Sequence, residues 1–298
     1  MSEPHASPLS PPMPFGQLLD EAMKQTRRHF RQIYPPVAIP LALVALGMGV
    51  IQAINLQNLS TLSTGNPFAL SLDTVALAFV ALILMSIGFM ALQVAAVEAA
   101  AGRPVDLRRA WSFACQPAVL GTLLLQGLAI LASVIACLLP VLYVFPLFAF
   151  TGVVMAAENL FGTRALGRSA ELTRYNPRRQ FVETPMVKIL AVMVLSIVIS
   201  WLVSLLVVLP FQASMFVDIF RQAAGGETEP LRGMAQWGWI QLIPQLLQSL
   251  ISTAVYLYLS FCFALLFFDT RKEGTDLTAA VDAVFQPPAP PPFGGSRP

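Results

Sequence analysis

The chain has 298 residues, of which 56% are hydrophobic and only 11% are charged, and its formal net charge is +2. Soluble domains carry about 25% charged residues, so this composition excludes an ordinary water-exposed surface. Five stretches contain no Asp, Glu, Lys or Arg: 32–72, 74–97, 110–157, 189–217 and 233–268. A helix needs about 20 apolar residues to cross a bilayer, and in lipid a helix satisfies its own backbone groups. The sequence therefore predicts an all-α integral membrane protein.

Few residues in the sequence are suited to chemistry. His5 and His29 are the only histidines, and Cys115, Cys137 and Cys262 lack the paired spacing of a disulfide framework or a zinc site. Motifs typical of zinc peptidases, of His-based nucleophiles and of phosphate-binding glycine loops are missing from the sequence. We therefore expect no enzyme activity, no cofactor, no metal and no nucleic-acid partner.

The spans are predicted from the apolar runs. Residues 1–14 and 286–298 are rich in proline and predict two disordered tails around a membrane domain of residues 15–285. Within this domain we expect six transmembrane helices, at about 37–57, 74–98, 118–139, 141–158, 187–209 and 242–268. Pro140 is expected to form the turn between the third and fourth spans, and Pro146 to kink the fourth.

The distribution of basic residues predicts the orientation. With six spans, all of the 18 Lys and Arg residues except Arg221 and Arg232 fall on one side. Loops rich in Lys and Arg stay in the cytoplasm, so both termini are expected to be cytoplasmic. Trp237 and Trp239 would then lie at the outer interface, where aromatic rings are favoured.

Three basic segments precede the pairs of spans and carry apolar residues at helical spacing. They are FGQLLDEAMKQTRRHFRQIY at 15–34, VDLRRAWSFA at 105–114 and TRALGRSAELTRYN at 163–176. We interpret each segment as an amphipathic helix in the inner headgroup layer, with its arginines toward anionic lipid.

The pairs of spans also end alike. EAAAG contains Glu98 and Gly102, ENLFG contains Glu158 and Gly162, and DTRKEG, which begins at Asp269, is a less similar third copy. The fold predicted from these similarities is three pseudo-repeated helical hairpins, each preceded by a cytoplasmic amphipathic helix.

Charged residues at the predicted cytoplasmic face form the first candidate site. Acidic residues end three apolar helices, and basic residues follow them closely, so we interpret the set as helix-end anchors; an ion path is the alternative. The candidate residues are Glu98, Glu158, Arg168, Glu171, Arg174, Asp269 and Arg271.

A polar stripe on the sixth span forms the second candidate site. Its residues recur at steps of three or four, which places them on one helix face. The stripe is either a packing seam between helices or a path for a polar solute. It consists of Gln245, Ser249, Ser252 and Tyr256, flanked by Gln241 and Ser260.

Three segments support a family resemblance. FGQLLDEAMKQTRRHF, AENLFGTRALGRSAELTR and LLFFDTRKEGTDL resemble the six-span bacterial membrane proteins related to the glycerophosphoryl diester phosphodiesterase membrane domain and the YciC-like family. The resemblance covers roughly residues 15–285. It implies six spans and a cytoplasmic position for Arg168, Glu171 and Arg174. It implies no catalytic residue, because in fused relatives the diesterase activity belongs to a separate soluble barrel.

Two functional hypotheses follow from the sequence. The first is a non-enzymatic module of the bacterial inner membrane that organises lipid or partner proteins through its basic interfacial helices. Its expected partners are anionic lipid headgroups, another membrane protein or a second copy of the chain. The alternative is a transporter or permease subunit with a polar path along the sixth span.

Overall fold

The computed structural model describes residues 13–61, 72–136, 138–174, 184–224 and 239–271. Within these ranges every element is an α-helix, which confirms the all-α class. The helices are α1 (Phe15–Thr61), α2 (Leu72–Ala100), α3 (Leu107–Ala114), α4 (Pro117–Ala136), α5 (Leu138–Leu147), α6 (Thr151–Glu158), α7 (Thr163–Thr173), α8 (Pro185–Ala224) and α10 (Leu242–Arg271). Of the two predicted tails, only residues 13 and 14 lie within the described residues.

Five described helices are long and apolar enough to cross a membrane, and the number rises to six if a bent pair counts as one span. The five are in α1, α2, α4, α8 and α10. The bent pair consists of Tyr143–Glu158 and Thr163–Thr173, which meet at 115°. The chain therefore has the helices of a multi-pass membrane protein.

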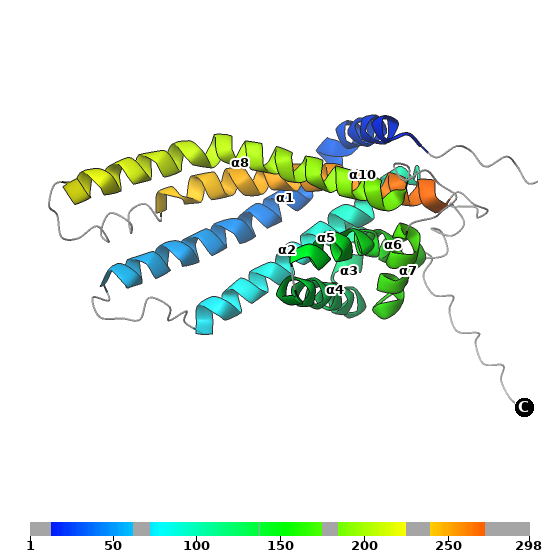
Figure 1. Cartoon of the computed structure of the whole chain (residues 1–298), viewed down its shortest axis with the longest axis horizontal. Helices are drawn as coiled ribbons and strands as arrows, with labels where there is room; N and C mark the ends of the chain where they lie inside the picture. The colour runs from blue at the N-terminus through cyan, green and yellow to red at the C-terminus, as the bar shows by residue number, and fades with distance from the viewer. Residues whose placement is uncertain (1–12, 62–71, 137, 175–183, 225–238, 272–298) are drawn as a thin grey trace, which may run out of the picture.

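Four long helices run side by side, while α3 to α7 gather at one end of the molecule beside α2 (Figure 1). Helix α10 packs against α1, α2 and α8, so it is the central member of this group. Large apolar side chains point outward from α4 and α8, among them Leu128 and Leu206. Such exposed apolar surface is expected where helices face lipid.

Helix α1 joins two predicted elements. The segment 15–34 and the predicted first span belong to one α-helix, although Pro35, Pro36 and Pro40 lie inside it. Proline removes a backbone donor and bends a helix, and the dark-blue start of α1 lies at an angle to its long remainder (Figure 1). The Tyr34 hydroxyl donates to the carbonyl of Leu250 at 3.0 Å, which ties the bent region to α10.

The fourth predicted span, 141–158, is divided in the structure. Helix α5 ends at Leu147 and α6 begins at Thr151. The carbonyl of Leu147 accepts a hydrogen bond from Ser169 Oγ at 2.7 Å, and that of Phe148 accepts one from Gln126 Nε2 at 3.3 Å. Side chains of α7 and α4 thus donate to carbonyls at the interruption, where the Phe148 carbonyl also accepts from the N–H of Thr151, and a break follows the expected kink position at Pro146.

One predicted turn is corrected, and one helix extends beyond its predicted span. Helix α5 begins at Leu138, so Pro140 lies in its first turn rather than in a turn between spans. This position suits proline, because N–H groups in the first turn have no helical acceptor. Helix α8 runs from Pro185 to Ala224, past the predicted end at residue 209 and through Pro210.

The core lies where α2, α6 and the second half of α10 meet. Ala91, Ala95 and Ala99 are buried on α2, as their spacing predicts. On α6, every residue from 151 to 157 is buried. A Cβ at Gly152 would collide with Gln93 Oε1, so the absence of a side chain allows α6 to approach α2 closely.

Candidate functional site

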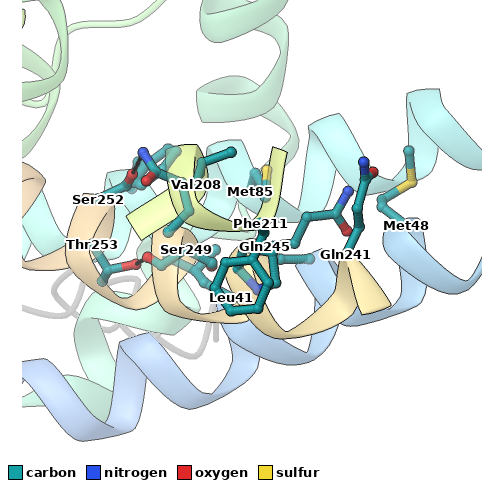
Figure 2. A pocket seen from close by; sticks show the side chains of 14 residues that line it. Leu41, Met48, Met85, Val208, Phe211, Gln241, Gln245, Ser249, Ser252 and Thr253 are labelled. Carbon is teal, nitrogen blue, oxygen red and sulfur yellow. Dashed lines mark hydrogen bonds between the residues drawn. The ribbon is translucent and has the colours of Figure 1, made fainter. Parts of the chain in front are cut away.

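A cavity of about 470 Å³ lies between α1, α2, α8 and α10. We call it the central cavity, and Figure 2 shows the side chains that line it. Its 14 described lining residues are Leu41, Ala45, Met48, Met85, Phe89, Val208, Phe211, Gln241, Pro244, Gln245, Gln248, Ser249, Ser252 and Thr253. The volume falls within the range of about 300–1,000 Å³ that is common for small-molecule sites.

The polar groups of the central cavity come from α10. Gln245 Nε2 donates to Gln52 Oε1 of α1 at 2.8 Å, which joins the two helices. The Oε1 atoms of Gln245 and Gln248 are buried and accept no hydrogen bond in the described part of the chain. Ser249 and Ser252 add hydroxyl groups to the same wall.

The predicted polar stripe therefore has two roles. Gln245, Ser249 and Ser252 line the central cavity, whereas Tyr256 does not. Tyr256 instead stacks on Phe89, with ring centroids 4.1 Å apart. The stripe both joins helices and borders a cavity.

Sequence reasoning missed several residues of the central cavity. Gln248 and Thr253 lie beside the stripe and were not part of it. The spacing of α10 contains a signal for Gln248, which lies three residues after Gln245. The sequence contains no comparable signal for the apolar wall. Met48 and Met85 belong to other helices, and hydropathy does not show which sides of two helices face each other.

A second, open groove of about 780 Å³ lies between α1, α8 and α10. We call it the arginine groove, because Arg27 and Arg31 of α1 border it. Both arginines are exposed, and neither forms an ion pair within the described part of the chain. Its other lining residues are Met23, Thr26, Phe30, Tyr34, Leu195, Ser196, Ile199, Leu250, Ile251, Ala254, Val255 and Tyr258.

Glu98 is buried at the end of α2 and contacts the segment that begins α3. Its Oε2 accepts a hydrogen bond from the backbone N–H of Asp106 at 3.0 Å. Asp106 in turn caps α3 by accepting from the N–H groups of Arg108 and Arg109. The carboxylate of Glu98 therefore acts as a helix-end anchor.

Glu158 is anchored by Arg168 of α7. Arg168 Nε lies 3.2 Å from Glu158 Oε2, and Arg168 Nη1 lies 2.8 Å from Glu171 Oε2. One guanidinium thus bridges two predicted site residues. Arg174 follows α7 with an exposed side chain, and its N–H donates to the carbonyl of Ala170.

Asp269 is buried near the end of α10, where it meets the start of α1. Its two oxygens each lie 3.1 Å from the backbone N of Met13, and Oδ2 lies 3.9 Å from Lys188 Nζ. Lys188 also donates to the carbonyl of Met13 at 2.7 Å. Arg271 ends α10, and its side chain lies outside the described part.

Within the described ranges, no three His, Cys, Asp or Glu side chains lie close enough together to hold a metal ion. The helices have the length and apolar composition of a multi-pass membrane protein, and two mainly apolar spaces lie between them. The chain matches no protein-family model, no curated protein and no solved structure.

Proposed function

We propose that the chain is a non-enzymatic inner-membrane module that binds anionic lipid and so organises lipid or partner proteins. The observation that carries the proposal is the arginine groove, in which two exposed arginines border an apolar space. Membership of the family related to the glycerophosphoryl diester phosphodiesterase membrane domain and the YciC-like proteins is part of the proposal and rests on sequence resemblance alone.

The arginine groove has the chemistry of a phospholipid site. Arg27 and Arg31 are four residues apart on α1 and both border the groove. Guanidinium groups bind phosphate oxygens in pairs. Ile199, Leu250 and Val255 line the groove beside them and offer an apolar surface to an acyl chain. An anionic headgroup would thus supply the negative charge that pairs with these arginines.

The proposed topology supports this placement. If Lys- and Arg-rich segments face the cytoplasm, the groove opens toward the inner leaflet, where anionic lipids attract basic residues by about 1 kcal/mol per Lys or Arg.

The acidic helix ends support the proposed three-unit arrangement. Glu98 contacts the segment that begins α3, Glu158 contacts α7, and Asp269 contacts the start of α1. Each acidic residue thus contacts the amphipathic segment of the next proposed unit, and the third unit contacts the first. Gly102 and Gly162 both have positive φ, at 74° and 62°, as matched positions in two copies would.

The experiment compares how well the purified full chain and its variants retain an anionic and a zwitterionic phospholipid. We expect native mass spectrometry in detergent to show that the wild-type chain retains phosphatidylglycerol in preference to phosphatidylcholine. The Arg27→Gln/Arg31→Gln variant should lose this preference by on the order of tenfold, because two charge-assisted phosphate contacts disappear.

A matched control is available on the same helix. Lys24 and Arg28 are exposed and do not line the arginine groove, so Lys24→Gln/Arg28→Gln removes the same charge and should retain phosphatidylglycerol. Equal losses in the two variants would show general attraction to anionic lipid rather than a site. A wild-type chain that retains neither anionic lipid nor a protein partner from native membranes would refute the proposal.

A transporter or permease subunit is the second candidate, because the predicted polar stripe borders the central cavity. The Gln245→Leu/Ser252→Ala/Tyr256→Phe variant would then lose solute flux in proteoliposomes while keeping its unfolding temperature. Osmotic swelling with small uncharged solutes measures this flux, and an unchanged rate would reject the candidate.

A further inference from the structure

We infer that the central cavity is a binding site for one uncharged amphiphile whose polar end donates hydrogen bonds. The inference goes beyond the anionic-lipid function and does not require it. The central cavity and the arginine groove share no lining residue, because they lie on different faces of α10. Ser249 and Thr253 face the first space, whereas Leu250 and Ala254 face the second.

The lining of the central cavity excludes an ionic ligand. None of its 14 described lining residues is charged. A charge buried among apolar helices needs a partner of opposite sign, and the cavity offers none among these residues. An uncharged ligand avoids this cost.

Among the described residues, two buried side-chain atoms of the cavity's lining lack a hydrogen-bond partner, and both are acceptors. Gln245 Oε1 and Gln248 Oε1 are buried without a hydrogen-bond partner in the described part of the chain. The amide nitrogen of Gln245 donates one of its two N–H groups to Gln52 Oε1. Because buried acceptors are normally paired, two orphaned oxygens in one cavity point to a ligand with O–H or N–H groups.

The opposite walls are apolar. Figure 2 shows Gln245, Ser249 and Ser252 on α10 and Gln241 just before it, whereas Leu41, Met48, Met85, Val208 and Phe211 come from the other three helices. Methionine side chains adapt to ligands of irregular shape. A molecule with a hydroxyl or amide head and a hydrocarbon body therefore fits both walls.

The test uses a photoactivatable monoacylglycerol that carries a diazirine in its acyl chain. The purified full chain is placed in phosphatidylcholine nanodiscs, and crosslinked peptides are identified by mass spectrometry. We expect crosslinks on α1, α2 or α8 at the apolar wall, and competition by unlabelled monoolein. The Gln245→Leu/Gln248→Leu variant should lower the apparent affinity by on the order of tenfold, because both acceptors are lost.

Two further variants separate this site from the arginine groove and from misfolding. Arg27→Gln/Arg31→Gln should label like the wild-type chain. Ala45→Phe fills the cavity from α1 and should abolish labelling, with the unfolding temperature in detergent reporting whether the variant is folded. Undiminished labelling of a folded Ala45→Phe or Gln245→Leu/Gln248→Leu chain, or a cavity that holds only water and takes no label, would overturn the inference.

Discussion

Lys188 and Asp269 place two opposite charges in the buried contact between the ends of α8, α10 and α1. Both side chains are almost fully shielded, and both also bond to the backbone of Met13. Buried charges of this kind are costly to separate, because each one keeps its desolvation penalty when its partner is removed. The cluster therefore holds the start of α1 against the bundle.

Asp269→Asn is expected to destabilise the protein by about 3 kcal/mol, because it removes the negative charge of a buried ion pair with Lys188. The matched control is Glu171→Gln, which makes the same change in an exposed ion pair with Arg168 and should cost less than about 1 kcal/mol. Thermal unfolding of the two variants in detergent measures the difference. Equal shifts in unfolding temperature would contradict the role given to the buried pair.

At this scale the sequence identified the acidic residues but not their partners. Glu98, Glu158 and Asp269 were predicted as anchors because they end apolar runs. Arg168, which follows Glu158 closely in the sequence, forms an ion pair with it. Lys188 pairs with Asp269 although the two residues are far apart in sequence and on different helices.

Glycine positions distinguish the two faces of α1. Gly47 has open space around it, whereas a Cβ at Gly49 would collide with Gln245 Oε1 and approach Leu242 Cδ2 to 2.6 Å. The second glycine thus allows α1 and α10 to meet where Gln52 and Gln245 are hydrogen-bonded.

Gly49→Ala is expected to destabilise the protein by about 1–3 kcal/mol, because the added methyl group must displace side chains of α10. Gly47→Ala should instead stabilise it by up to about 1 kcal/mol, since alanine is the better helix residue at an open position. Thermal unfolding of both variants in one detergent checks the opposite signs. If Gly47→Ala also destabilised the protein, the effects of the two substitutions would reflect lipid or detergent contact rather than helix packing.

At the scale of elements, hydropathy predicted the long helices better than the short ones. The spans expected at 74–98 and 242–268 correspond closely to α2 and α10. The fourth predicted span, 141–158, corresponds to α5 and α6, and the interruption after Leu147 receives hydrogen bonds from Ser169 and Gln126 of other elements. Local sequence contains Pro146 but not these partners.

The distribution of basic residues predicts how the whole molecule is oriented in the membrane. In a chain whose own cysteines are replaced, Gly226→Cys should react with a membrane-impermeant maleimide in intact spheroplasts. Ser10→Cys should react only after the membrane is permeabilised, because the N-terminus is expected in the cytoplasm. Gel-shift labelling distinguishes the two, and labelling of Ser10→Cys in intact spheroplasts would reverse the proposed topology.

The sequence alone determined the class of the protein. Long charge-free runs and a low content of charged residues specify a multi-pass helical membrane protein, because the bilayer selects for apolar length whatever the tertiary contacts are. Only the tertiary structure decided where the central cavity and the arginine groove lie. Both spaces depend on which helix faces meet, and residues as far apart as Leu41 and Gln245 come together there through packing that hydropathy does not encode.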